Sequence, residues 1–107
     1  MKPVPLNKDD ARLVQMLAAL GSPLRFRMLR YLAACPECRV GDVVEQVPLA
    51  QSTVSEHLKV LRDAGLVHDE RAGTAKCCTL DRESLRWLAE EIAALAEGEE
   101  TRGRHPG

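Results

Sequence analysis

Residues 51–67 constrain the fold of this 107-residue chain more than any other segment. Val54, Leu58 and Leu61 are spaced at i, i+4 and i+7, which predicts an amphipathic helix with one buried face. Gly65 is expected to end this helix, because glycine tolerates the left-handed conformation at a helix C-terminus. The opposite face carries hydroxyls and an amide first and cations after them. That order suits a helix in a DNA major groove, and an ordinary solvated surface helix is the alternative.

Turn and capping signals divide the rest of the chain into short elements. Ser22 followed by Pro23 predicts a helix start, since a hydroxyl N-cap and a proline at the first helical position are both favoured. Asp81 is expected to cap the last helix. The expected order is helices at 8–20, 23–34, 41–47 and 51–64, strands at 66–71 and 76–80, and a helix from 82 to about 96, with a brief extended piece at 39–40. This is a mainly α, winged helix-turn-helix arrangement.

Apolar periodicity assigns a buried face to each helix. The expected core positions are Leu13, Met16, Leu17 and Leu20 in the first helix, Leu24, Met28 and Leu32 in the second, and Val43, Val44 and Val47 in the third. Arg25, Arg27 and Arg30 of the second helix are expected to be mostly solvated. In the last helix, Leu85, Leu88, Ile92 and Leu95 form a seam suited to a partner helix.

Length and composition indicate one small globular domain at 8–96, with a loose arm at 1–7 and a disordered charged tail at 97–107. The net charge of −1 leaves a nucleic-acid partner open, because a local basic face is what counts. Three aromatic residues are too few for single-strand binding by stacking. We see no signal peptide and no apolar run of membrane-spanning length, so we expect a cytoplasmic protein without a membrane partner. Nucleophile–base pairs and phosphate loops are not recognisable, so we do not expect an enzyme.

Several segments together resemble the ArsR/SmtB family of metal-responsive repressors. They are LGSPLRFRML at 20–29, GDVV at 41–44, LAQSTVSEHLKVLRDAGLV at 49–67 and the wing glycine at 73. The likeness covers residues 10–95, and its most specific part is 51–67. The resemblance implies a homodimer paired through the first and last helices. Such a dimer binds an operator in double-stranded DNA and blocks transcription until an inducer binds.

The predicted recognition helix and wing hold the candidate DNA contacts. The candidates for base edges are Gln51, Ser52, Thr53 and Ser55. The candidates for phosphates are Lys59, Arg62, Arg71 and Lys76. His57 lies inside the helix, and we interpret it as structural or phosphate-facing.

Four cysteines form the candidate sensor. In a winged helix, the extended piece before the third helix pairs with the last wing strand, which would bring Cys35 and Cys38 beside Cys77 and Cys78. Neighbouring strand residues point to opposite faces, so we expect one of the adjacent pair to join Cys35 and Cys38. Three thiolates suit As(III) or Sb(III). Cadmium or lead would need another ligand or a distorted site, and zinc normally takes four ligands, which a bulge at the adjacent pair would supply.

This cysteine pattern departs from the family. Arsenic-sensing members carry a Cys-x-Cys-containing motif inside the third helix, where this chain has GDVVEQV at 41–47, and zinc-sensing members use Asp, His and Glu on the last helix, which has no histidine here. The sensor is therefore expected at the entrance of the third helix and the wing. The alternatives are a repressor with a reversible disulfide between the two cysteine pairs, a zinc-, cadmium- or lead-responsive repressor, four inert buried cysteines, and a winged-helix protein-interaction module stabilised by zinc.

Overall fold

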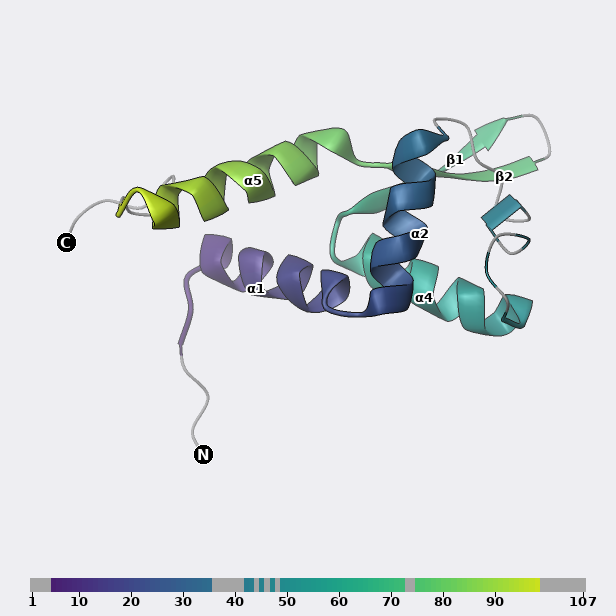
Figure 1. Cartoon of the computed structure of the whole chain (residues 1–107), viewed down its shortest axis with the longest axis horizontal. Helices are drawn as coiled ribbons and strands as arrows, with labels where there is room; N and C mark the ends of the chain where they lie inside the picture. The colour runs from purple at the N-terminus through teal and green to yellow at the C-terminus, as the bar shows by residue number, and fades with distance from the viewer. Residues whose placement is uncertain are drawn as a thin grey trace.

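The computed structural model describes residues 5–35, 42–43, 45, 47, 49–72 and 75–98, with side chains not described at 71–72 and 75–76. Its elements are α1 (Lys8–Leu20), α2 (Pro23–Ala34), α4 (Gln51–Asp63), β1 (Val67–Ala72), β2 (Ala75–Leu80) and α5 (Arg82–Ala96). Residues 42, 43 and 45 are also helical, within the segment expected to form the third helix. Helices α1 and α5 lie side by side (Figure 1). Helix α4 and the hairpin lie toward the opposite end of the molecule, and α2 runs across the region between these two parts. The described elements follow the predicted winged helix-turn-helix order, and the extended piece expected at 39–40 lies outside the described residues.

Side-chain caps begin three of the helices. The Asn7 side chain accepts a hydrogen bond from the Asp10 amide at 2.7 Å. The Ser22 hydroxyl accepts from the Arg25 amide at 3.3 Å, which confirms the predicted start of α2. The Asp81 carboxylate accepts from the Ser84 amide at 2.9 Å, which confirms the predicted cap of α5. These bonds satisfy amides that have no partner within their own helix.

The end of α4 is closed by a two-bond motif around Gly65. The Gly65 amide donates to the Arg62 carbonyl at 2.9 Å, and the Leu66 amide donates to the Leu61 carbonyl at 3.0 Å. Gly65 has φ +78°, a conformation that side chains rarely adopt, which confirms the predicted helix end. Leu66 takes part in this closure, so β1 begins at Val67, one residue later than expected.

The core lies where α1, α2, α4 and the hairpin meet. Its fully buried side chains include Met16, Met28, Leu32, Leu61 and Leu66. Most expected core positions of the described helices are confirmed, including the three predicted on α4: Val54, Leu58 and Leu61. None of the described helices has the length and apolarity needed to cross a membrane.

Two residues depart from the expected pattern. Leu17 was predicted to be buried but is 44% exposed, while Ala19 takes a core position instead. The reason is geometric: α1 presents to its neighbours the stripe centred on Leu13 and Met16, and Leu17 lies beside that stripe. Arg25 was expected to be solvated but is half-buried and hydrogen-bonded, because its guanidinium folds back over the end of α1.

The hairpin is antiparallel, with Val67 opposite Leu80 and Ala72 opposite Ala75. Its strands reach one residue further toward the turn than the sequence indicated, so only residues 73 and 74 connect them, and these lie outside the described residues. In this register Asp69 pairs with Cys78, and Glu70 pairs with Cys77.

Candidate nucleic-acid interface and cysteine site

Helix α4 separates a buried apolar face from an exposed polar one. Gln51, Ser52 and Ser55 are exposed at or near its N-terminus, and Thr53 is half-buried. No side chain caps this end, because Ala50 stands at the N-cap. Because Gln51, Ser52 and Ser55 are exposed, their amide and hydroxyl groups can reach an outside partner. This is the surface that the sequence predicted for base-edge contacts.

The positively charged side chains that follow these groups along α4 differ in their ion pairs. Lys59 lies 3.4 Å from the Asp63 carboxylate, and its side chain is 70% exposed, so this ion pair is weak and solvent-screened. The Arg62 guanidinium forms an ion pair with Asp69 of β1, and both side chains are about one third exposed. Arg62 therefore ties α4 to the hairpin. Arg71 and Lys76 are cross-strand partners near the tip of the hairpin, and their side chains lie outside the described residues.

His57 is half-buried and belongs to an internal network. Its Nδ1 lies 3.2 Å from Nη1 of Arg25, on the first turn of α2. The sequence left two roles open for His57, structural or phosphate-facing, and this contact with Arg25 is a structural one. Sequence reasoning missed Arg25 as a functional candidate, although its place three residues after the Ser22 N-cap puts it beside the end of α1.

The cysteines occupy distinct environments. Cys77 and Cys78 are buried cysteines outside any disulfide at adjacent positions of β2, so their side chains point to opposite faces of the hairpin. Cys78 belongs to the main core cluster, and half-buried Cys35 packs against that same cluster at the end of α2. Cys35 is disulfide-bonded, and because neither Cys77 nor Cys78 forms a disulfide, this bond does not join the two cysteine pairs. Cys38 lies outside the described residues.

The described residues do not bring three potential metal ligands together. Within that part of the chain, no group of three or more His, Cys, Asp or Glu side chains could hold an ion. Cys35, as a disulfide, is not available as a thiolate in this state. A three-thiolate site of the predicted kind therefore requires reduction of Cys35.

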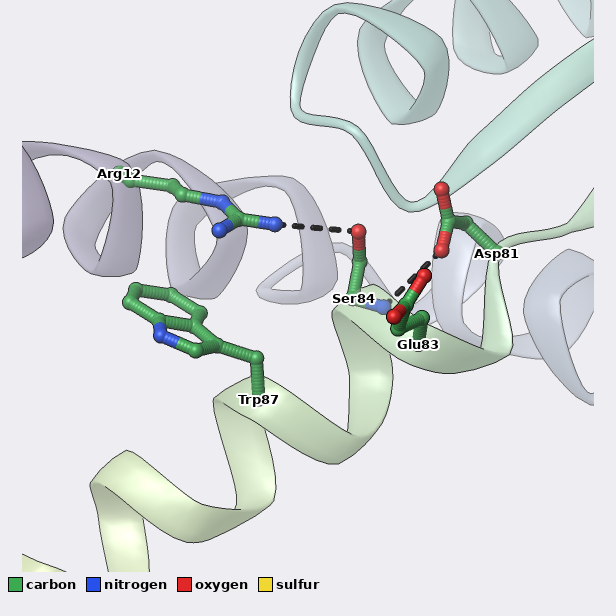
Figure 2. A pocket seen from close by; sticks show the side chains of 5 residues that line it. All are labelled: Arg12, Asp81, Glu83, Ser84 and Trp87. Carbon is green, nitrogen blue, oxygen red and sulfur yellow. Dashed lines mark hydrogen bonds between the residues drawn. The ribbon is translucent and has the colours of Figure 1, made fainter. Parts of the chain in front are cut away.

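A pocket of about 360 Å³ between α1 and α5 was not anticipated from the sequence. Figure 2 shows Arg12 of α1 extending over Trp87 and toward Ser84, with Asp81 and Glu83 at the start of α5. The Arg12 Nη2 donates to the Ser84 hydroxyl at 3.1 Å, and its guanidinium carbon lies 4.3 Å from the centre of the Trp87 ring. These contacts attach α1 to α5 by a hydrogen bond and a cation–π interaction. The long sequence separation of Arg12 and Trp87 left no local signal for this contact.

Comparison with known proteins places the chain among transcription regulators. Residues 22–69 match the family described as "Bacterial regulatory protein, arsR family". The HTH-type transcriptional regulator NmtR of Mycobacterium tuberculosis is 41% identical over 91 residues, which cover 85% of this chain and 75% of NmtR. The HTH-type transcriptional repressor SmtB of the same organism is 37% identical over 59 residues, and the match spans 55% of this chain but only 43% of SmtB.

The solved structures agree on the fold. An ArsR-like transcriptional regulator from Rhodococcus sp. RHA1 superposes with a TM-score of 0.80 over 86% of both chains, at 20% sequence identity. The names of the family and of these relatives describe regulators, not enzymes. Family match, identity to NmtR and helical order agree, and the chain belongs to the arsR family of bacterial regulatory proteins.

Proposed function

We propose that the protein is a DNA-binding transcriptional repressor that acts as a homodimer. The observation that carries this proposal is helix α4, whose Val54, Leu58 and Leu61 are buried while its polar N-terminal turns are exposed. Gln51, Ser52, Thr53 and Ser55 would read base edges in the major groove. Lys59, Arg62, Arg71 and Lys76 would contact phosphates, and Arg62 would then exchange its partner Asp69 for a phosphate oxygen.

The proposed dimer forms through α1 and α5. Val14 and Leu17 of α1, and Ile92 and Leu95 of α5, are between 41% and 62% exposed. Two adjacent helices that leave branched apolar side chains in water favour an apolar contact with a second copy. A two-fold dimer would present two recognition helices to successive major grooves about one helical turn apart.

Binding is tested by incubating the full chain with a random-sequence pool of duplexes and sequencing the bound fraction. The enriched sequence is called the selected duplex below. A repressor of this type should enrich a pseudo-palindromic sequence, because the dimer is symmetric. A protein-interaction module would enrich none.

Lys59→Ala is expected to weaken binding to all DNA sequences and to lower the slope of log affinity against log salt by about one unit. The reason is that one fewer phosphate would be neutralised on binding. The slope is measured by fluorescence anisotropy over a series of salt concentrations. Lys8→Ala, an exposed lysine at the start of α1, is the control and should leave the slope as it is. An unchanged slope in the Lys59 variant would remove Lys59 from the phosphate contacts.

We infer that the inducer is a thiophilic metalloid, As(III) or Sb(III), held by Cys35, Cys38 and Cys78 in the reduced protein. Cys78 is preferred over Cys77 because Cys78 and Cys35 border the same core cluster, whereas Cys77 lies on the other face of β2. Three sulfur ligands match the trigonal preference of these ions. The ion would draw the end of α2 against the hairpin, and the hairpin would then favour the pair of Asp69 and Arg62 over the contact of Arg62 with a phosphate.

In reduced protein, arsenite is expected to weaken binding to the selected duplex by about a hundredfold, a coupling of about 2.7 kcal/mol. Cys78→Ser should bind the duplex normally and lose this response, whereas the matched variant Cys77→Ser should keep it. The measurement is a titration of duplex release with arsenite, repeated with antimonite, zinc, cadmium and lead. Full release of the Cys78 variant by arsenite would exclude Cys78 as a ligand.

Redox sensing is the second candidate function, and the disulfide at Cys35 favours it. Disulfides in proteins of reducing compartments are usually transient and regulatory. The two functions are separated by measuring the affinity of oxidised and of reduced wild-type protein for the selected duplex, with no metal or metalloid present. A change in duplex affinity that Cys35→Ser abolishes would support redox control.

A further inference from the structure

The Arg25 side chain connects three helices. Its Nε donates to the Ala19 carbonyl at 2.7 Å and its Nη2 donates to the Ala18 carbonyl at 3.4 Å, both near the end of α1. Its Nη1 lies 3.2 Å from Nδ1 of His57, in the middle of α4. Each of the three guanidinium nitrogens therefore has its own acceptor. Lysine could not reproduce this, because it offers one nitrogen in place of a planar fork.

The contact of Arg25 with α1 stabilises the C-terminus of that helix. The last carbonyls of an α-helix have no partner within the helix, and its C-terminus carries partial negative charge. Helix α1 has no basic residue in its own last turn. Arg25 donates to the Ala19 carbonyl and to the Ala18 carbonyl, which also accepts from the Gly21 amide at 3.2 Å, and it supplies the positive charge from the next helix. This interaction anchors the Arg25 guanidinium firmly at the end of α1.

The contact with α4 then orients the recognition helix. A guanidinium can only donate, so Nδ1 of His57 accepts and the ring proton resides on Nε2. A second link lies further along α4, where Nε2 of Gln15 donates to the Asp63 carbonyl at 3.2 Å. His57 and Asp63 are six residues apart, which separates the two attachments by about 9 Å along the helix. Two separated attachments restrict the tilt of α4 relative to α1, whereas one would leave a pivot.

We propose that Arg25 is a positioning residue that sets the orientation of recognition helix α4 relative to dimerisation helix α1. This inference rests on the proposed function, in which α1 contacts the partner subunit and α4 contacts DNA. The tilt of α4 relative to α1 then determines how the two recognition helices of the dimer are spaced. Base-edge contacts depend on that geometry, while contacts with phosphates tolerate small shifts.

Arg25→Lys keeps the positive charge and removes the planar guanidinium that donates to three acceptors at once. We expect it to lower affinity for the selected duplex about tenfold, with little change for a mixed-sequence duplex of equal length at the same salt concentration. Arg27→Lys is the matched control on an exposed position of the same helix and should change neither affinity. Circular dichroism and sedimentation confirm that each variant is folded and dimeric.

His57 supplies an independent pair of variants. His57→Leu removes the acceptor and should reproduce the loss of the Arg25 variant. His57→Asn places an amide oxygen near the position of Nδ1 and should restore most of the discrimination between the two duplexes. In the double variant Arg25→Lys, His57→Leu, the two losses should not add, because both remove the same contact.

An unchanged ratio of selected to mixed-sequence affinity in Arg25→Lys would overturn the inference. An equal loss for both duplexes would also overturn it, since that pattern indicates a general effect of folding or charge. If the Arg25 variant does not fold, the comparison of His57→Leu with His57→Asn decides. Failure of the wild type to enrich any duplex is a different result, which contradicts the proposed function itself.

Discussion

Replacement of Leu61 by alanine is expected to lower the free energy of unfolding by about 3 kcal/mol. Leu61 is fully buried in α4, in the core cluster shared by α1, α2, α4 and the hairpin. The truncation removes apolar contact and leaves a cavity that the surrounding helices fill only in part. Such a loss is a large fraction of the stability of a small domain, which is typically about 5–15 kcal/mol. Urea denaturation followed by circular dichroism measures it.

Val60→Ala is the matched control for this change. Val60 precedes Leu61 in the same helix but is 40% exposed, so its truncation leaves no buried cavity. Its cost should stay below about 1 kcal/mol. Similar costs for the two variants would show that the buried face of α4 does not contribute to the core as described.

Ile92→Glu is expected to dissociate the proposed dimer and to weaken binding to the selected duplex by at least about a hundredfold. The Ile92 side chain is 41% exposed on α5 and belongs to the seam that would face the second copy. A carboxylate there would be buried without a partner on dimerisation, which costs several kcal/mol. A monomer would then contact one half-site and lose the gain from bivalent binding. Sedimentation velocity and fluorescence anisotropy measure the two effects.

Arg86→Glu provides the control, because it places the same side chain on an exposed position away from the apolar seam of α5. It should remain dimeric and bind the selected duplex with nearly wild-type affinity. If Ile92→Glu stays dimeric while binding as tightly as the wild type, the dimer does not form through α5. If it becomes monomeric but still binds tightly, dimerisation is not required for operator recognition.

Local signals in the sequence predicted most of the secondary structure. Ser22 and Asp81 cap their helices, and Gly65 ends α4 with positive φ, as expected. Capping and helix termination depend on residues within about one turn of each other, so they can be read along the chain. The buried stripe of α4 was likewise predicted correctly, since its three core positions follow the helical period.

Contacts between distant segments could not be predicted in the same way. The apolar pattern of α1 made Leu17 as plausible a core residue as Met16, and only the placement of the neighbouring helices left Leu17 exposed. Arg12 meets Ser84, its hydrogen-bond partner on α5, across 72 residues of sequence. Likewise, the sequence placed Cys77 and Cys78 on opposite faces of a strand, and the fold determined that Cys78 faces the core.

The sequence by itself determined the order of the helices and strands, the caps that begin two of the helices and the buried face of the recognition helix. These features depend on spacing and on nearby residues, which a single chain records directly. The tertiary structure decided which side chains link one helix to another. Arg25 is the clearest case, because its place between the end of α1 and His57 requires three helices to pack together. A long, charged side chain reveals its partners only when the fold has placed acceptors within its reach.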